Sequence, residues 1–288
     1  MTEESLRRAV LVEAEELRTL LATDTRLVLL DVRWSLADPD GHRAYSLGHL
    51  PGALFVDLER DLSASPSPEA GRHPLPDIEQ LQAAARRWGI DDGDPVVVYD
   101  DSGGTSAARA WWLLRWGGVA DVRILDGGLQ AWLAAGGILE DGDVQVAPGD
   151  VVLSPGHMPV TDADGVADLP GHGVLLDARA EERYRGDEEP IDRRAGHVPG
   201  AVNVPTVRNL REDSRFKSET ELAQQYADAG VDARTDVAVY CGSGVNAAHE
   251  IAALETIGVH AALYPGSWSQ WSADDDRPVA TGIERPTS

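Results

Sequence analysis

Residues 27–53, LVLLDVRWSLADPDGHRAYSLGHLPGA, and residues 173–201, GVLLDARAEERYRGDEEPIDRRAGHVPGA, share one pattern. Each begins with an apolar run, continues through Asp-x-Arg and a polar stretch, and ends in Gly-His-x-Pro-Gly-Ala. Self-similarity of this kind indicates that a structural unit occurs more than once in the chain. The sequence therefore predicts an internal duplication.

A second matched pair follows in the same order. Residues 95–132 begin PVVVYDDSGGTSAARAWW and end GGLQAW, while residues 236–271 begin DVAVYCGSGVNAAHEIAA and end PGSWSQW. Between the two copies, residues 138–160 are rich in Gly, Pro and Asp and have no helical period. We therefore predict a first domain at residues 1–140, a linker at 141–160 and a second domain at 161–288.

Each predicted domain alternates short apolar runs with helical patterns. The runs LVLLD, VVVY, VLLD and VAVY are typical of buried parallel strands. The stretches IEQLQAAARRWGI at 78–90 and ELAQQYADAGV at 221–231 have a helical period, with a Gly near the C-terminal end. This alternation predicts an α/β fold in which each domain has a parallel sheet with helices on both faces.

The composition excludes several classes of function. The 288 residues include 49 acidic and 25 basic side chains, a formal net charge of −24, whereas binding of nucleic acid requires a basic face. No apolar run reaches the roughly 18 to 20 residues of a membrane helix. The N-terminal MTEESLRRAVLVEAEEL is typical of the start of an amphipathic helix rather than of a signal peptide. We therefore expect a cytoplasmic protein that binds neither nucleic acid nor membrane.

The single cysteine, Cys241, is the candidate nucleophile. One cysteine excludes an intrachain disulfide and a cysteine-rich metal site. Cys241 directly follows the predicted strand VAVY and precedes a Gly-rich turn and a helix that begins near Val245. Backbone N–H groups of such a turn and the positive end of a helix favour a thiolate over a thiol. They also supply local positive potential, which an acidic protein needs in order to bind an anion.

The run CGSGVNAAH at 241–249 resembles the active-site loop of the rhodanese superfamily, and the Gly-His boxes and PGSWSQW at 265–271 are similar to its other signatures. The resemblance covers nearly the whole chain and implies tandem rhodanese domains with the active cysteine in the second. Asp100 stands where the second copy has Cys241, which implies a first domain that has no nucleophile and supplies one wall of a cleft.

The loop also separates subfamilies by resemblance. Thiosulfate sulfurtransferases usually carry Arg and Lys right after the cysteine, whereas the 3-mercaptopyruvate enzymes carry Cys-Gly-Ser-Gly-Val-Thr. This chain matches the second pattern except at its last position, where Asn replaces Thr. The resemblance also implies a triad of Ser243, His73 and Glu59, with Glu in place of the family's Asp.

The residues expected to bind the substrate are those of the cysteine loop and one or two arginine side chains. The loop residues Gly242, Gly244, Val245 and Asn246 are expected to line the substrate site. Arg183 in RYRG resembles the family's substrate arginine. An arginine suits this role, because its planar guanidinium pairs two carboxylate oxygens. For a second arginine, Arg193 is the first candidate and Arg194 is the alternative; Ile191 can occupy the family position instead.

The leading hypothesis is a 3-mercaptopyruvate sulfurtransferase that carries a persulfide on Cys241. Its partners are a small anionic sulfur donor and an acceptor that is a thiol, thioredoxin or cyanide; neither a metal nor an organic cofactor is implied. The main alternative is a thiosulfate:cyanide sulfurtransferase that uses the same cysteine. A cysteine phosphatase needs an arginine six residues after the cysteine, where this chain has Ala247. A non-enzymatic sulfur carrier on the same scaffold is the remaining alternative.

Overall fold

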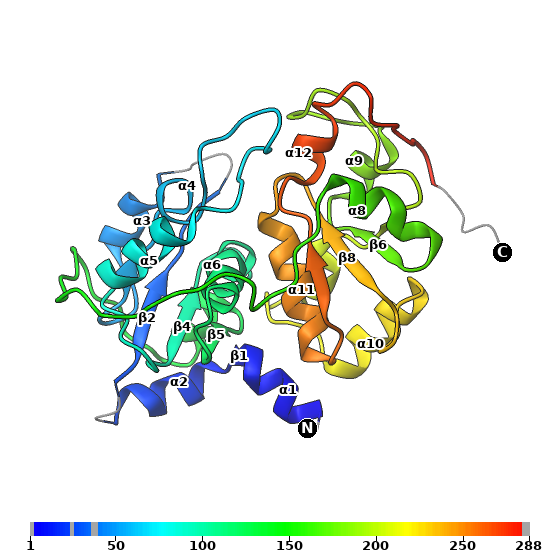
Figure 1. Cartoon of the computed structure of the whole chain (residues 1–288). Coiled ribbons are helices and arrows are strands. Elements are labelled where there is room, and N and C mark those ends of the chain that lie inside the picture. Colours follow the sequence, from blue (N-terminus) through cyan, green and yellow to red (C-terminus); the bar gives the residue numbers. More distant parts are fainter. Residues whose placement is uncertain (1–2, 24–25, 36–39, 284–288) are drawn as a thin grey trace. The chain divides into compact units, whose positions relative to one another are not determined.

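The apolar runs form parallel sheets in the computed structural model of the chain, which describes residues 3–23, 26–35 and 40–283 (Figure 1). Contacts among residues divide the chain into two units, each with its own sheet. The first unit comprises Met1–Ala64, Pro76–Met158 and Leu210–Phe216, and the second comprises Ser65–Leu75, Pro159–Asn209 and Lys217–Ser288.

The first unit has a five-stranded sheet in the order β1-β5-β4-β2-β3, with every pair parallel. Its strands are β1 (Leu11–Val12), β2 (Val28–Asp31), β3 (Leu54–Phe55), β4 (Val96–Tyr99) and β5 (Val122–Leu125). Its helices are α1 (Glu3–Val10), α2 (Ala14–Leu21), α3 (His42–Leu47), α4 (Leu58–Asp61), α5 (Ile78–Arg87), α6 (Thr105–Trp116) and α7 (Gly128–Ala134).

Helices cover both faces of this sheet, as the alternating pattern predicts. Leu17 of α2 and Trp132 of α7 form one buried cluster with Leu29 and Val97 of the central strands. Helix α6 packs against β4 and β5 and takes no part in that cluster, so it lies on the other face (Figure 1). With both faces covered, β2 and β4 are buried along their whole length, which explains their unbroken apolar sequence.

The second unit has a four-stranded parallel sheet in the order β7-β6-β8-β9. Its strands are β6 (Val174–Asp177), β7 (Val202–Asn203), β8 (Val237–Tyr240) and β9 (Ala261–Leu263). Its helices are α8 (Ala163–Asp168), α9 (Glu181–Arg185), α10 (Glu219–Asp228), α11 (Val245–Thr256) and α12 (Ser267–Trp271), with 3-10 turns at Leu169–Gly171 and Thr206–Asn209. Strand β8 is central, and the chain leaves its carboxyl end at Cys241.

The two Gly-His boxes have the same structural role in their own units. His49 stacks on Tyr45 with ring centroids 4.1 Å apart, and His197 stacks on Tyr184 at 3.8 Å. Both histidines are fully buried. Each box is also tied to the central strand of its unit, since a backbone N–H of each donates to the hydroxyl of the tyrosine that ends the strand. The boxes thus hold a loop against the sheet.

Each unit includes a short segment from the other half of the sequence. Residues 210–216 belong to the first unit, where Phe216 is buried and its N–H donates to Asp126 Oδ1 at 2.8 Å. Residues 65–75 belong to the second unit, where Arg72 N–H donates to Ser269 Oγ at 3.0 Å. No sequence pattern predicts this grouping. The predicted boundaries at 140 and 160 stay predictions.

The N-terminal segment begins with a helix, as expected, but a short strand interrupts the helical stretch. Helices α1 and α2 are separated by β1, whose two residues are buried and pair with β5. Three consecutive apolar residues, Val10 to Val12, suit a buried edge of the sheet better than a helix with one polar face. No helix formed by the described residues has the length and apolar content needed to span a bilayer.

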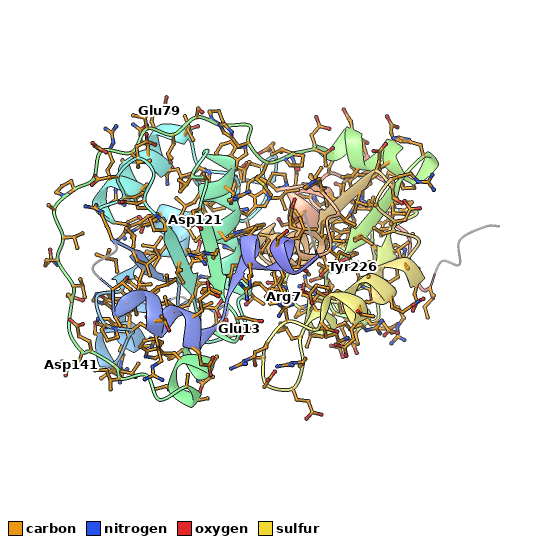
Figure 2. The ribbon with its side chains drawn as sticks, turned by 90° about the horizontal axis from the view of Figure 1, so that it is seen from below. Arg7, Glu13, Glu79, Asp121, Asp141 and Tyr226 are labelled. Carbon is orange, nitrogen blue, oxygen red and sulfur yellow. The ribbon has the colours of Figure 1, made fainter. Side chains whose placement is uncertain are left out.

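A buried carboxyl group links α11 to its surroundings in the second unit. Glu250 is fully buried; its Oε2 accepts from Asn209 Nδ2 at 2.7 Å and its Oε1 from the hydroxyl of Tyr226 at 3.0 Å. Tyr226 lies on α10 and is labelled in Figure 2. Burial raises the pKa of Glu250 from 4.5 to about 8. The folded protein therefore holds a proton here that the unfolded chain releases.

We expect this group to make the protein less stable as the pH rises. A folded-state pKa above the unfolded value contributes stability that is complete below about pH 4.5 and is lost as the pH passes through 8. Between pH 4.5 and 8 this group should lower the unfolding free energy of the wild-type protein by ~3–5 kcal/mol. Glu250→Gln should remove that part of the pH dependence. Urea unfolding at several pH values measures it. Glu182→Gln, at an exposed carboxylate, should keep the wild-type slope; an equally steep slope in Glu250→Gln contradicts the assignment.

Candidate active site

The candidate nucleophile lies in a tight loop between β8 and α11. Cys241 is buried, with 3% of its surface exposed, and its Sγ accepts a hydrogen bond from the N–H of Gly244 at 3.1 Å. Gly244 precedes the first residue of α11 and has φ of 81°, a left-handed conformation that favours glycine. The sulfur therefore lies beside a backbone donor at the positive end of a twelve-residue helix, a setting that stabilises negative charge.

Helix α12 fixes the conformation of this loop. The N–H of Cys241 donates to Ser267 Oγ at 3.1 Å, and the carbonyl of Cys241 accepts from Trp268 N–H at 3.0 Å. The carbonyl of Gly242 accepts from Ser269 N–H at 2.9 Å. Sequence reasoning did not assign Ser267, although its place in the repeated closing motif was a usable signal. PGSWSQW thus supports the loop through its backbone and one hydroxyl.

A histidine and a serine meet beside the cysteine loop within the second unit. His73 Nδ1 and Ser243 Oγ are 2.7 Å apart, and both residues are more than 90% buried. Segment 65–75 brings His73 to this unit from far away in the sequence. A histidine in hydrogen-bond contact with a serine can move a proton to or from it. The structure thus brings together two of the three residues predicted as a triad.

The third predicted member, Glu59, lies on α4 in the first unit. Its Oε1 accepts a hydrogen bond from Trp34 Nε1 at 3.1 Å. The assignment of Glu59 to the triad stays a prediction.

Two guanidinium groups lie against the loop at Gly242. A methyl group placed on Gly242 would be 3.1 Å from Arg72 Nη2 and 3.5 Å from Arg183 Nη1. Arg183 is the predicted substrate arginine. Arg72 was missed by the sequence reasoning, although it directly precedes His73 in GRHPLP. The position next to the cysteine is therefore flanked by two positive charges.

Two carboxylates pair with these guanidinium groups. Arg183 Nη2 contacts Glu189 Oε1 at 2.6 Å and Asp192 Oδ2 at 2.9 Å. Arg72 Nη1 is paired with the other oxygen of Asp192, Oδ1. Both carboxylate side chains are less than 5% exposed. Asp192 thus bridges the two arginines that border the loop.

The remaining arginine candidates point to other partners. Arg193 has 64% of its side chain exposed and pairs with Asp275 at 3.0 Å. Arg194 donates to four backbone carbonyls, those of Trp271, Ser272, Asp274 and Arg277. These bonds commit Arg194 to holding the segment that follows α12. Of the predicted loop residues, Val245 is buried and Asn246 is exposed in the first turn of α11.

The corresponding loop of the first unit shows what such a loop can bind. Asp100 follows β4, and its buried carboxylate accepts four backbone hydrogen bonds of 2.8–3.0 Å from Ser102, Gly104, Ser106 and Ala107. Burial raises the pKa of Asp100, and these four amides act to lower it. A loop between a strand and a helix in this fold therefore provides enough donors for a buried acidic group. In the first unit, that space is filled by the chain itself.

Comparison with known proteins gives the same family for both halves of the chain. The rhodanese-like domain family matches residues 13–135 and 162–274. A protein of Mycobacterium tuberculosis named "Putative thiosulfate sulfurtransferase SseB" is 50% identical over 279 residues, which cover 96% of this chain and 98% of that protein. One of Pseudomonas aeruginosa named "Probable 3-mercaptopyruvate sulfurtransferase" is 46% identical over 95% of this chain and 99% of that protein.

A solved structure has the same architecture. The crystal structure of SseA from Escherichia coli, described as a 3-mercaptopyruvate sulfotransferase with the rhodanese fold, superposes with a TM-score of 0.80. It is 34% identical in sequence, and the match covers 90% of this chain and 98% of that one. The predicted α/β fold of tandem domains is thereby confirmed.

Proposed function

Because the chain belongs to the rhodanese family, we propose that it is a sulfurtransferase that moves sulfane sulfur from 3-mercaptopyruvate to a thiol or cyanide acceptor through a persulfide on Cys241. One observation carries the proposal. The sulfur of Cys241 lies at the start of α11 and accepts from Gly244 N–H, with the His73–Ser243 pair beside its loop. This combines a sulfur held beside a backbone donor with a pair of side chains that can move protons.

In the first half of the reaction, the thiolate of Cys241 attacks the sulfur of the donor. The new S–S bond forms as the donor's C–S bond breaks, and the electron pair of that bond stays with the carbon as pyruvate enolate. The proton of the donor thiol ends on that carbon, so that pyruvate leaves. Cys241 is left as a persulfide whose charge the loop N–H groups stabilise.

Ser243 and His73 are assigned the transfer of this proton. Their 2.7 Å contact allows the hydroxyl to exchange a proton with the imidazole without an intervening water. Burial of both side chains keeps bulk solvent away from the exchange. Glu59 is proposed, by the resemblance alone, to orient the histidine.

In the second half, a nucleophilic acceptor attacks the outer sulfur of the persulfide. The S–S bond breaks and its electron pair returns to Cys241, which regenerates the thiolate. The chain has one cysteine, so the sulfur cannot be released by an internal disulfide. The persulfide must wait for a separate acceptor, which predicts ping-pong kinetics.

Thiosulfate is the alternative donor, and a specific observation favours it. Two guanidinium groups border Gly242, and such cations, considered without the carboxylates that pair with them, suit a dianion. With thiosulfate, the same attack on the outer sulfur breaks an S–S bond and releases sulfite. No proton has to reach carbon, so the His73–Ser243 pair would have no evident part in that reaction.

Comparing kcat/KM for the two donors under identical conditions tests the choice. We expect 3-mercaptopyruvate to be preferred at least about tenfold, because the His73–Ser243 pair can accelerate the reaction of this donor and has no step to accelerate with thiosulfate. Mass spectrometry after exposure to donor should show one added sulfur atom on Cys241. A tenfold preference for thiosulfate would reverse the donor assignment, and the absence of any adduct with either donor would contradict sulfur transfer.

A further inference from the structure

We propose that Arg72 is the second donor-binding guanidinium of this site, paired with Arg183, and that Asp192 is an internal carboxylate that occupies this clamp until the donor's carboxylate arrives. The proposal rests on the proposed function and deepens it, because it assigns the residues that select a monoanionic carboxylate over a dianion.

Arg72 lies against the cysteine loop together with Arg183. A Cβ atom placed on Gly242 would be 3.1 Å from Nη2 of Arg72 and 3.5 Å from Nη1 of Arg183, so both guanidinium groups lie on the same side of Gly242. Gly242 is the residue next to the cysteine, so both guanidinium groups border the loop that carries the reacting sulfur. Planar guanidinium groups bind carboxylates through two parallel hydrogen bonds, which fixes orientation as well as position.

The hydrogen bonding of Arg72 supports the same role. Its Nη1 meets Asp192, but its Nε is buried and has no hydrogen-bond partner among the residues that the structure describes. A buried donor without an acceptor is costly and rare in native proteins. Arg72 therefore retains hydrogen-bonding capacity that its pairing with Asp192 does not use.

The other candidate positions for a second arginine have other partners or carry no charge. Arg193 is exposed and paired with Asp275, Arg194 is bound to four carbonyls, and Ile191 carries no charge. None of the three positions considered for a second arginine presents a guanidinium to the loop. Arg72 reaches Gly242 from a separate segment, which is held to α12 through the bond from its own N–H to Ser269 Oγ.

Asp192 determines how much negative charge the clamp accepts. It bridges Arg72 and Arg183 while only 4% exposed, as a bound carboxylate would. Arg72 and Arg183 together with Asp192 and Glu189 sum to zero charge. The carboxylate of one donor can take over the contacts of Asp192 with the two arginines. The second negative charge of a dianion would find no further cation in this cluster to pair with. The cluster therefore favours a monoanionic carboxylate over thiosulfate.

Steady-state kinetics test the clamp. Arg72→Gln should raise KM for 3-mercaptopyruvate by about tenfold or more, with a smaller change in kcat, since the lost contact binds the non-reacting end of the donor. Arg208→Gln, which removes a surface cation paired with Glu181 in the same unit, should stay within about twofold of wild type. Asp192→Asn should shift the kcat/KM ratio toward thiosulfate by about fivefold or more.

Alkylation of Cys241 gives a readout that does not depend on sulfur transfer. Cys241 is the only cysteine, so the rates with iodoacetate and with neutral iodoacetamide compare a carboxylate and an amide at one thiolate. Arg72→Gln should lower the iodoacetate-to-iodoacetamide rate ratio about fivefold or more, and Asp192→Asn should raise it.

The two readouts separate the two proposals. If Arg72→Gln leaves both KM and the alkylation ratio unchanged, or if Arg193→Gln lowers the ratio as much as Arg72→Gln does, the assignment of Arg72 is wrong. If the ratio shifts as expected while the wild-type protein transfers no sulfur from either donor, the clamp stands and the proposed function fails.

Discussion

Replacing Cys241 with serine should lower sulfur transfer from either donor by at least about a thousandfold. The substitution changes one atom and keeps the approximate shape of the side chain. A serine hydroxyl is not ionised near neutral pH, and it cannot form the persulfide on which both halves of the reaction depend. Release of pyruvate or sulfite, measured with purified protein in steady state, gives the rate.

The structure makes this experiment easy to interpret. Serine at position 241 can still accept from Gly244 N–H, and its own N–H can still donate to Ser267. The unfolding midpoint should therefore change little, and mass spectrometry should find no sulfur adduct. Residual transfer within tenfold of wild type would show that Cys241 does not carry the sulfur.

Replacing His73 with glutamine should lower kcat/KM for 3-mercaptopyruvate by about 10² to 10⁴, the usual contribution of a positioned acid or base. The loss with thiosulfate should be at least tenfold smaller, because sulfite leaves as a stable anion and needs no proton on carbon. Glutamine keeps a polar group near Ser243 but cannot relay a proton as imidazole does. Parallel assays with both donors measure the difference.

Ser243→Ala provides the matched variant for the same step. It should reproduce the donor-dependent loss, and the double variant should be little worse than either single one, since the two side chains act as a unit across one hydrogen bond. Equal losses with both donors would remove the basis for a proton-transfer role. In that case, the 2.7 Å contact would have a structural purpose only.

Much of the fold was predictable because its signals are local. Unbroken apolar runs such as VLLD and VAVY occur where a strand is buried on both faces, and these runs became β6 and β8. Because the two copies have the same order of motifs, each copy independently predicts the order of strands and helices. The position of Cys241 followed from the same logic, since a residue between a buried strand and a helix lies at the carboxyl edge of a parallel sheet.

What the sequence did not predict depends on contacts between distant residues. Arg72 and Gly242 are 170 positions apart, and nothing in the run GRHPLP indicates that its arginine would border the cysteine loop. The pairing of Asp192 with two arginines has no local signature either. Charged side chains are mostly exposed, so a sequence pattern alone does not distinguish the exposed Arg193 from the largely buried Arg72.

The place of segment 65–75 in the second unit limits how the protein can be dissected. A fragment that begins at residue 161 would contain Cys241, Ser243 and Arg183 but neither Arg72 nor His73. Such a fragment would keep the candidate nucleophile but lose the histidine that contacts Ser243 and one of the two arginines of the proposed clamp. The second half of the duplicated chain is therefore not self-sufficient, and the first half is not dispensable. Any attempt to shorten the chain has to retain a loop encoded in the half that lacks the cysteine.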